Sequence, residues 1–570
     1  MRGRILCVLI LISLLLSTFS FIMINERRFF SGQAVPLGLS SVEQELVKLV
    51  NGSRAYDTDL QLESISSSYP GFRAAGSAGA NEAAGWIKGQ FDGLGLNVSL
   101  DSFPFTTWNL LSKPTLVIDD DGNPGTLDDQ ATISSFECEH MSWPTPSSGV
   151  FANLVILPLS PAANRGEVDL NPINITRWNE INTTGKIVLI GREVRWSNTW
   201  QQAFIGKITV QTPAAVVYTW WYSWMSFVPP FFSSSGGKPL GGASAYYWDL
   251  HVPVGFVGYD DGLWIRTTAD TQPNIAANVT IQSEIGNGPH YNVVGRIEGF
   301  KNPEKLVLVS GHYDTVMDNG FLDNGAGTAG IIELAHVFTE AAQLGLYKPS
   351  YTLIFVAFTG EEMDLVGSIY YVAQHKDEMA NLTAVINLDC IGSDDLYLTE
   401  TDPSDGFDLD QTIIACANDL GISATLEPPG GSDQESFRIP YDVNYWCYYD
   451  WGINPGISDA TPVNSSVLLD SYPLFYNDLW TRGKAGWIHT GYDNSTSTAT
   501  LNWTKPENLG NHIKVAALAV MRISPNAVVV PEFPLHPILA LIAVTSFFAV
   551  VFKKRKSPPN EIGKPAKTWD

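Results

Sequence analysis

Three short apolar runs alternate with amphipathic stretches in the middle of the chain, between residues 305 and 389. The runs are KLVLVSGH at 305–312, YTLIFVAF at 351–358 and TAVINLD at 383–389. Between them apolar positions recur at helical spacing, as in IIELAHVF at 331–338. Apolar runs separated by helical patterns are typical of parallel strands buried on both faces of a layered sheet. We therefore predict an α/β fold with a mixed, mostly parallel sheet flanked by helices.

Residue types that can bind metals lie at or shortly after the end of each apolar run. In chain order they are His312, Asp314, Asp323 in a Gly-rich turn that opens a helix, Glu361, Glu362 and Asp389. In open α/β sheets the ligand crevice lies beyond the carboxyl ends of the strands, so these side chains are expected to converge. Mixed imidazole and carboxylate ligands suit zinc. A fifth ligand is expected from downstream, and His489 is the best candidate because it precedes only the last helical pattern of the domain.

The order of these residues resembles the two-zinc exopeptidases of peptidase clan MH, the group that holds aminopeptidase Y and glutamate carboxypeptidase II. The shared pattern is an HxD, an Asp before Asn and small residues, a Glu-Glu pair, an Asp after Asn-Leu, and a late His-Thr. The resemblance covers roughly residues 57–523, with one insertion. It implies a zinc aminopeptidase-like fold and the hydrolysis of peptides.

The resemblance also implies which residues hold two zinc ions. One ion is expected on His312 and Asp389. The other is expected on Glu362 and His489. Asp323 is expected to bridge both ions, because a carboxylate shared by the two sites holds them close enough to act on one water and one scissile carbonyl.

Glu361 is expected to be the general base. It would accept a proton from the water between the two zinc ions, leaving a bridging hydroxide, and pass that proton to the leaving amine. Asp314, two residues after His312, is expected to accept the proton of the other ring nitrogen of that histidine and fix its orientation. The resemblance further implies a cis peptide bond between Asp323 and Asn324.

Two positions depart from the family pattern. Residues 431–437, GSDQESF, resemble the family's Ser-Asp-His segment, but Gln434 stands where the histidine is usual. In several relatives a Tyr just before the last zinc ligand stabilises the tetrahedral intermediate, whereas this chain has Ile488 there. Tyr492 is near enough in sequence to be the candidate transition-state stabiliser in its place.

An apolar segment opens the chain. Arg2 and Arg4 precede a stretch from Ile5 to Ile24 that carries no charge. A stretch of that length is enough to span a bilayer, and the same pattern serves a secretory signal. Residues 1–28 are therefore predicted to be either a cleaved signal peptide or a signal-anchor, and both would export the body of the protein.

A second apolar segment comes after the body of the protein. Residues 535–552 are followed by Lys553, Lys554, Arg555 and Lys556. This arrangement is typical of a transmembrane segment whose C-terminal flank stays in the cytoplasm, here residues 553–570. The linker 526–534 contains a PEF element that also resembles archaeal C-terminal sorting signals, in which case the segment is trimmed and replaced by another anchor. We expect a protein of the cell membrane with its catalytic domain extracytoplasmic.

The body of the protein contains an insertion. A helix at about 81–94 and a following strand are typical of the start of a peptidase domain of this family, yet the metal-binding residues come far downstream. The intervening segment 109–285 is rich in Pro, Gly, Ser and aromatic residues, lacks a βαβ rhythm, and has strands near 185–191 and 214–218. It resembles a protease-associated domain, a β-rich module that some family members carry at this point. The peptidase domain is then predicted to comprise residues 41–108 and 286–525.

Composition narrows the classes of partner. The formal net charge is −25 and the pI is about 4.7, which argues against nucleic acid as a partner. Only 16% of residues are charged, so the acidity reflects scarce Lys and Arg rather than dense carboxylate runs. Five cysteines, one of them in the N-terminal apolar segment, do not make a disulfide framework.

The sequence therefore predicts a membrane-anchored, extracytoplasmic two-zinc exopeptidase that acts on peptides, with aminopeptidase as the expected activity. Three alternatives stay open: a carboxypeptidase of the same family, a one-metal glutaminyl cyclase, and a catalytically silent relative that acts as a binding protein. The complete ligand set together with Glu361 favours two metals and catalysis. The choice between a free amine and a free carboxylate on the substrate is left open by the sequence.

The predicted topology has a direct test. Cations flank both apolar segments on their outer sides, so the positive-inside rule places both flanks in the cytoplasm and residues of roughly 30 to 530 outside. Protease added to intact cells is expected to digest the body of the protein, as followed by immunoblotting. Protection of the body until the cells are lysed would contradict this topology.

Overall fold

The computed structural model describes much of the chain between residues 38 and 527. The described ranges are 38–119, 130–158, 175–191, 198–219, 250–272, 274–363, 365–393, 396–399, 409–427, 432–438, 465–469, 488–489, 493–497 and 504–527. The two predicted membrane segments, 1–28 and 535–552, lie outside the described residues, as does the predicted tail 553–570. Within the ranges given, no helix combines the length and apolarity needed to cross a membrane.

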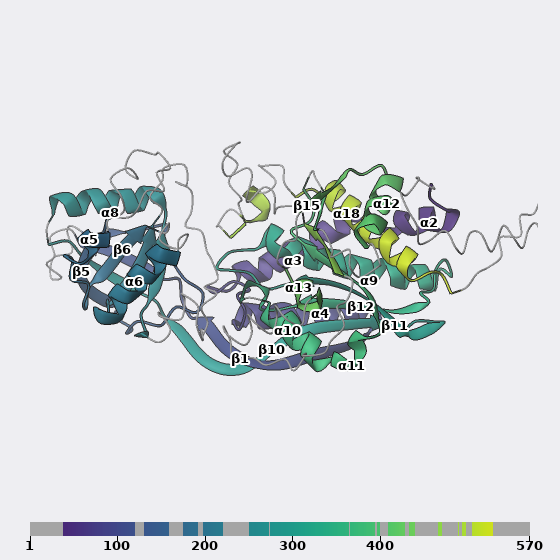
Figure 1. Cartoon of the computed structure of the whole chain (residues 1–570), viewed down its shortest axis with the longest axis horizontal. Coiled ribbons are helices and arrows are strands. Elements are labelled where there is room, and N and C mark those ends of the chain that lie inside the picture. The colour runs from purple at the N-terminus through teal and green to yellow at the C-terminus, as the bar shows by residue number, and fades with distance from the viewer. Residues whose placement is uncertain are drawn as a thin grey trace, which may run out of the picture. The chain divides into compact units, whose positions relative to one another are not determined.

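Among the described residues, eight strands form the first sheet in the order β1-β10-β12-β11-β13-β16-β14-β15 (Figure 1). Their bounds are β1 Asn97–Leu110, β10 Ser283–Ile297, β11 Asn302–His312, β12 Tyr351–Phe358, β13 Leu382–Asp389, β14 Leu396–Thr399, β15 Ala424–Glu427 and β16 Ser465–Leu469. The pairs β11–β12, β11–β13, β13–β16 and β14–β15 are parallel, whereas β1–β10, β10–β12 and β14–β16 are antiparallel. The predicted mixed, mostly parallel sheet is confirmed, and the three apolar runs form its centre.

Helices pack on both faces of this sheet. They include α3 Gly52–Ser67, α9 Gly327–Gln343, α10 Val366–Gln374, α13 Glu435–Arg438 and α18 Pro506–Ile523. Successive side chains of a strand point to opposite faces, so the continuous apolar runs supply two cores. Val307 and Val309 of β11 lie in one core with α3, α9 and α18. Leu306 and Leu308 lie in the other core with α10 and α13.

The N-terminal part of the first sheet follows the predicted order of helix and strand. The helix α4 (Ala78–Gly93) begins at Ser77, whose hydroxyl accepts a hydrogen bond from a main-chain N–H of the first turn. The strand β1 follows and pairs along its whole length with β10, antiparallel. The inserted segment leaves the first sheet at the end of β1 and returns to it at the start of β10. The strands between these two points form a separate sheet.

The inserted segment has its own sheet, in the order β3-β2-β9-β5-β6-β7-β8-β4 within the described residues. Their bounds are β2 Thr115–Asp119, β3 Gln130–Thr132, β4 Glu137–Cys138, β5 Val150–Leu157, β6 Ile187–Gly191, β7 Ala215–Thr219, β8 Val254–Val257 and β9 Ala276–Thr280. The strands predicted near 185–191 and 214–218 are confirmed as β6 and β7.

The prediction that this segment lacks a βαβ rhythm is wrong. The strands β6 and β7 are parallel, and α6 (Asn198–Val210) lies between them in the chain. Every residue of both strands is buried, so IVLIG and AVVYT are the continuous apolar runs of a parallel pair covered on both faces. The Pro, Gly and aromatic residues around them obscured this pattern.

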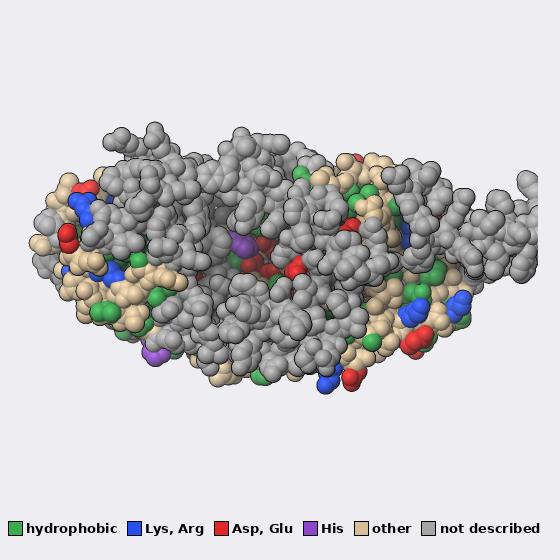
Figure 2. All heavy atoms as spheres, viewed as in Figure 1, with side chains coloured by type: hydrophobic (Ala, Val, Ile, Leu, Met, Phe, Trp, Pro, Cys, Tyr) green, Lys and Arg blue, Asp and Glu red, His purple; other side chains and the backbone are tan. Residues whose placement is uncertain are grey.

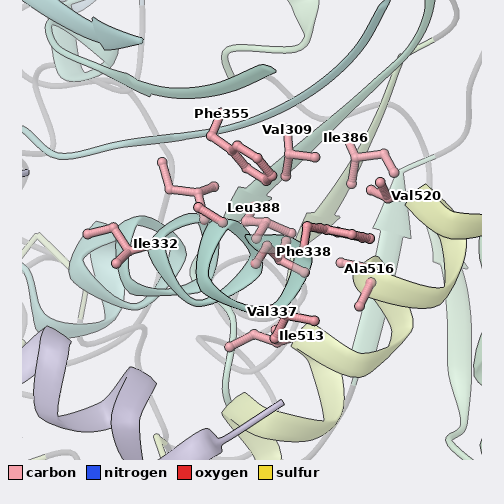
Figure 3. Packing of buried hydrophobic residues seen from close by; sticks show 14 of the residues in the cluster. Val309, Ile332, Val337, Phe338, Phe355, Ile386, Leu388, Ile513, Ala516 and Val520 are labelled. Carbon is pink, nitrogen blue, oxygen red and sulfur yellow. The ribbon is translucent and has the colours of Figure 1, made fainter. Parts of the chain in front are cut away.

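A layer of side chains from α9 and α18 packs on the centre of the first sheet. Figure 3 shows residues of both helices pointing toward Val309, Phe355 and Ile386 of the strands. Phe338 of α9 is fully buried there, and its ring centroid lies 6.4 Å from that of Phe355 and 5.6 Å from that of Tyr347. The helix α9 begins directly after the turn that carries Asp323, so this packing also positions that turn.

We expect Phe338→Ala to lower the free energy of unfolding by about 3–5 kcal/mol, because it leaves a cavity in a packed core. The measurement is denaturant unfolding followed by circular dichroism. Leu344→Ala is the matched control, since Leu344 is 64% exposed and its truncation leaves no cavity. Equal effects of the two substitutions would contradict this account of the core.

Candidate metal centre

The ends of three central strands bring the candidate residues together. His312 is the last residue of β11, and Asp389 is the last residue of its parallel neighbour β13. Glu361 and Glu362 form a short 3-10 turn just after β12, the parallel neighbour on the other side. The convergence predicted at the carboxyl ends of these strands therefore occurs.

Asp323 lies in a tight turn, η5 (Phe321–Ala326), directly before α9. Asp323 and Asn324 have non-helical backbone angles, and the peptide bond between them is cis, as the family resemblance implied. Gly320 precedes the turn with a left-handed φ of 57°. A Cβ at Gly320 would lie 2.1 Å from the Thr315 side chain and 2.6 Å from the carbonyl O of Asp323, so this position requires glycine.

The carboxylate of Asp323 faces a different histidine with each oxygen. Its Oδ1 lies 3.1 Å from Nε2 of His312, and its Oδ2 lies 3.0 Å from Nε2 of His489. The Nε2 of His489 also lies 3.0 Å from Oε1 of Glu362. The Nε2 of His312 lies 3.6 Å from Oδ1 of Asp389. Asp323 thus lies between two half-sites, one formed by His312 and Asp389 and the other by Glu362 and His489.

Two groups of side chains have the spacing of a metal site, and Asp323 belongs to both. Within each group, one possible ligand atom per residue lies within 4.8 Å of the others. The groups are His312, Asp323 and Asp389, and Asp323, Glu362 and His489. The grouping coincides with the two half-sites expected from the resemblance.

The charges in this cluster depend on one another. Burial alone would lower the pKa of His312, but the carboxylates of Glu361 and Asp389 outweigh it and raise that pKa well above its ordinary value. The same balance, with Glu362 as the main carboxylate, raises the pKa of His489. Burial would raise the pKa of Asp323, but its hydrogen bonds with both histidines lower it instead. Without metal, the cluster therefore draws protons onto its histidines.

Glu361 lies beside this cluster and belongs to neither group. Its Oε2 is 3.8 Å from Nε2 of His312, and burial raises the pKa of its carboxyl well above the ordinary value.

Asp314 contacts His312 as expected, but through its main-chain oxygen rather than through its carboxylate. The main-chain O of Asp314 lies 3.1 Å from Nδ1 of His312, whereas its carboxylate Oδ1 lies 3.6 Å away. That Oδ1 instead accepts a hydrogen bond from the N–H of Glu361 at 3.3 Å, so Asp314 orients both residues.

Asp493 links the late loop of the chain to the turn that carries Asp323. Its Oδ1 accepts a hydrogen bond from the N–H of Leu322 at 2.6 Å, and its Oδ2 accepts one from the N–H of Asp323 at 3.0 Å. Asp493 lies four residues after His489, so one short segment contributes a facing imidazole and the carboxylate that holds the turn.

Ser432 is a residue of the site whose role the sequence did not suggest. Its hydroxyl donates to Oδ2 of Asp389 at 2.6 Å and accepts a hydrogen bond from Nδ2 of Asn387 at 2.8 Å. The Oδ1 of Asn387 accepts a hydrogen bond from the hydroxyl of Ser310 at 2.8 Å. Nδ2 of Asn387 also lies 3.4 Å from Oε1 of Gln434, the position where the family has histidine. The only signal in the sequence was the GSDQESF segment, which gave no individual role to Ser432.

Arg73 is fully buried behind the turn that carries Asp323. Its guanidinium donates to the main-chain carbonyls of Leu62, Tyr313, Asn319 and Gly320 at distances of 2.8 to 3.0 Å. Asp59 and Asp318 are buried nearby, burial raises the pKa of both, and no described group donates a hydrogen bond to either carboxylate. The sequence gave Arg73 no role.

Of the predicted site residues, His312, Asp314, Asp323, Glu361, Glu362, Asp389 and His489 converge. Figure 2 shows a histidine and several acidic side chains together in a hollow of the surface. Tyr492, the candidate transition-state stabiliser, lies outside the described residues. Ile488 is described and packs against Leu322 and Cys390.

The residues fit a zinc centre on their own chemistry. The Oδ1 of Asp389 is buried and accepts no hydrogen bond from any residue in the described ranges, although it faces His312 and Asp323. A buried carboxylate oxygen without a donor is costly unless a cation or water satisfies it. Two imidazoles and three carboxylates at these separations are a donor set that zinc accepts.

A family model covers the region in which these residues lie. The model of peptidase family M28 matches residues 292–514. This region belongs to peptidase family M28. All the converging residues fall within the M28 region, and the inserted segment precedes it.

Two curated relatives align with parts of the chain. A probable zinc metalloprotease of Pyrenophora tritici-repentis is 34% identical over an alignment of 171 residues, which covers 27% of this chain and 37% of the relative. A probable leucine aminopeptidase 2 of Trichophyton verrucosum is 29% identical over an alignment of 272 residues, which covers 46% of this chain and 47% of the relative. Each alignment thus spans less than half of the relative's own length.

A solved structure resembles the chain over a longer stretch than the M28 region. It is a zinc aminopeptidase from Bacillus subtilis, with a TM-score of 0.56 and 21% sequence identity. The match covers 83% of this chain and 95% of that protein. At this identity the likeness shows the fold, and the predicted zinc aminopeptidase-like α/β fold is confirmed.

The charges of the centre predict a pH dependence for the metal-free protein. Burial raises the pKa of Asp433 and of Asp493 to about 7, so the folded state holds these protons more tightly than the unfolded state does. Their contribution to stability is present below pH 4 and is lost as the pH rises toward 7. The free energy of unfolding of the metal-free protein is therefore expected to fall between about pH 4 and pH 7.

Denaturant unfolding at a series of pH values, with and without zinc, measures this effect. Bound cations offset the buried negative charge, so the fall is expected to be smaller in the presence of zinc. Asp433→Asn is expected to flatten the metal-free profile, whereas Asp92→Asn, at a half-exposed position, is the control and leaves it unchanged. A metal-free protein that gains stability over this range would contradict the assignment.

Proposed function

We propose that this chain is a zinc-dependent exopeptidase, and that its activity is that of an aminopeptidase. The observation that carries the proposal is the position of Asp323. One oxygen of its carboxylate lies 3.1 Å from Nε2 of His312 and the other lies 3.0 Å from Nε2 of His489. A carboxylate that faces two imidazoles in this way is the arrangement expected of a ligand shared by two ions.

The residues proposed to hold the two zinc ions correspond to the two groups. His312 and Asp389 hold one ion. Glu362 and His489 hold the other. Asp323 is shared. Ions bound there supply Lewis acidity, which lowers the pKa of a water and polarises the scissile carbonyl of the peptide.

Glu361 is proposed as the general base. Its carboxylate lies beside the cluster without belonging to either group of ligands, and its pKa is raised by burial. A carboxylate with a raised pKa accepts a proton from the attacking water and returns it to the leaving amine more readily than an ordinary glutamate does. The N–H of Glu361 donates to Asp314, which fixes the position of its main chain.

Aminopeptidase activity is the proposal for the reaction class, with peptides as the substrate. The relative described as a probable leucine aminopeptidase supports it, and so does the fold shared with a zinc aminopeptidase. Purified full-length protein with zinc is assayed against peptides with a free amine, with a blocked amine and with C-terminal Glu. Cleavage of free-amine peptides alone is expected. Preference for the C-terminal-Glu peptide would favour a carboxypeptidase instead.

Three further proposals rest on the sequence. Residues 535–552 are proposed to anchor the protein in the cell membrane, supported by their apolar run and the cations that come after it. The catalytic domain is proposed to lie outside the cytoplasm, supported by the export pattern of residues 1–28. The inserted segment 109–285 is proposed to be a protease-associated domain, supported by its position before the M28 region.

Two substitutions separate the base from the shared ligand. Glu361→Gln keeps the shape of the side chain and removes the proton acceptor, so turnover is expected to fall by about 10² to 10⁴ while zinc content stays at two ions per chain. Asp323→Ala removes the ligand shared by both ions, so zinc and activity are expected to fall together. Peptide hydrolysis and elemental analysis of the dialysed proteins give both quantities.

The contrast between the two variants is the test. Wild-type turnover in Glu361→Gln would remove Glu361 from the reaction. A wild-type protein that holds zinc but cleaves none of the peptide classes would make the silent binding protein the better interpretation.

A further inference from the structure

Asn324, the residue after Asp323, makes an unusual set of contacts with the end of β13. Its side-chain Nδ2 donates to the carbonyl O of Leu388 at 2.8 Å. Its Oδ1 accepts a hydrogen bond from the N–H of Cys390 at 3.2 Å and from the N–H of Gly327 at 2.8 Å. Leu388 and Cys390 are the residues immediately before and after Asp389. One fully buried amide therefore holds the main chain on both sides of that carboxylate.

The backbone after Asp389 depends on this contact. Cys390 has a left-handed φ of 51°, which is uncommon for a residue with a side chain. Such a conformation persists where the surroundings fix it, and the hydrogen bond from the N–H of Cys390 to Asn324 is one such constraint. Cys390 is also buried beside Leu322 of the turn.

Gly327 makes the contact possible. A Cβ at this position would lie 2.2 Å from Oδ1 of Asn324 and 2.2 Å from the carbonyl O of Leu388. Both atoms belong to the hydrogen-bonded set, so no side chain fits between them. The glycine is required by space at this point, and its loss would push Asn324 away from Leu388.

We propose that Asn324 is a positioning residue that sets the separation between the shared carboxylate of Asp323 and the carboxylate of Asp389. Asp323 precedes Asn324 in the same turn, and Asp389 lies between the two residues that Asn324 holds. The amide thus joins the turn and the strand end that supply two carboxylates of one half-site. This role rests on the proposed two-zinc centre. Asn324 is not itself a proposed ligand, and its role is to position two residues that are.

The effect is expected at one half-site and not at the other. The half-site of His312 and Asp389 depends on the strand end that Asn324 holds. The half-site of Glu362 and His489 is connected to the turn through Asp493, whose carboxylate accepts hydrogen bonds from the N–H groups of Leu322 and Asp323. Groups that orient metal ligands change metal affinity by about 10- to 100-fold when they are altered.

The test uses the full-length protein freed of metal and titrated with cobalt(II), whose absorption and electron paramagnetic resonance spectra report each ion and their magnetic coupling. In Asn324→Asp, the Oδ1 acceptor remains and the donor to Leu388 is lost. We expect one of the two binding steps to weaken by about 10- to 100-fold, the other step to keep its affinity, and the coupling signal to be lost at equal cobalt.

A second substitution reaches the same contact from the opposite side. Gly327→Ala leaves Asn324 in the chain but fills the space that its amide needs, so it is expected to weaken the same binding step. If Asn324→Asp and Gly327→Ala weaken the same binding step, the contact between Asn324 and the end of β13 is the cause of that weakening. If one of the two variants fails to fold, the other carries the test.

Two control substitutions separate positioning from general loss of stability. Tyr347→Phe removes a buried hydrogen bond to the carbonyl O of Ser524, which lies beside the start of β12, at the end of that strand away from the centre. It is expected to lower stability without changing either cobalt affinity. Gly89→Ala introduces a methyl group in α4 where no heavy atom lies within 4 Å, and is expected to change neither cobalt affinity nor fold.

Each outcome decides between the proposals. Wild-type protein that binds two cobalt ions, with both affinities unchanged in Asn324→Asp, would overturn the role of Asn324 and leave the proposed function standing. Equal weakening of both steps, as a loose fold would produce, would overturn it as well. Wild-type protein that binds fewer than two ions would overturn the two-metal centre and the role of Asn324 together.

Discussion

The accumulation of negative charge at one edge of the sheet is the constraint on which the centre depends. The carboxylates of Asp389 and Glu362 each have a possible ligand atom within 4.8 Å of one on Asp323, all three residues are buried, and Glu361 lies beside them. Buried carboxylates at such separations repel one another strongly unless protons or cations lie between them. Two imidazoles in the same cluster supply part of that charge, and the proposed zinc ions would supply the rest. The fold therefore holds together buried carboxylates whose mutual repulsion is reduced by the two histidines and, in our proposal, by the zinc ions.

The sheet brings the charges together, and the loops set their directions. Parallel neighbours end at the same edge, so β11, β12 and β13 need no special residues to bring His312, Glu361 and Asp389 close. Parallel pairing does not determine the direction of a side chain. That direction depends on hydrogen bonds in the loops, such as the one that the hydroxyl of Ser432 donates to Asp389 and the one that the main-chain N–H of Glu361 donates to Asp314. The energy of the core and the geometry of the centre therefore have separate sources.

Much of the central sheet and of the centre was predictable from the sequence, because both rest on patterns of residue type. The continuous apolar runs marked buried parallel strands, and the polar residues after them marked the edge where ligands lie. The inserted segment was harder. Its strands β6 and β7 are as apolar as those of the first sheet, yet the helix between them has a mixed face and is flanked by Pro and aromatic residues. Periodicity alone therefore did not reveal the parallel pair.

The supporting contacts could not be predicted for a different reason. Arg73, Asn324 and Asp493 all act on main-chain groups: carbonyls for Arg73, N–H groups for Asp493, and both kinds for Asn324. Every residue except proline offers these groups, so the partner leaves no mark in the sequence. A metal ligand is recognised by its side chain, whereas the residue that positions it is recognised only when the fold shows which stretch of backbone it meets. For this reason Asp323 and Asp389 were recognisable before the fold was known, and the amide that joins them was not.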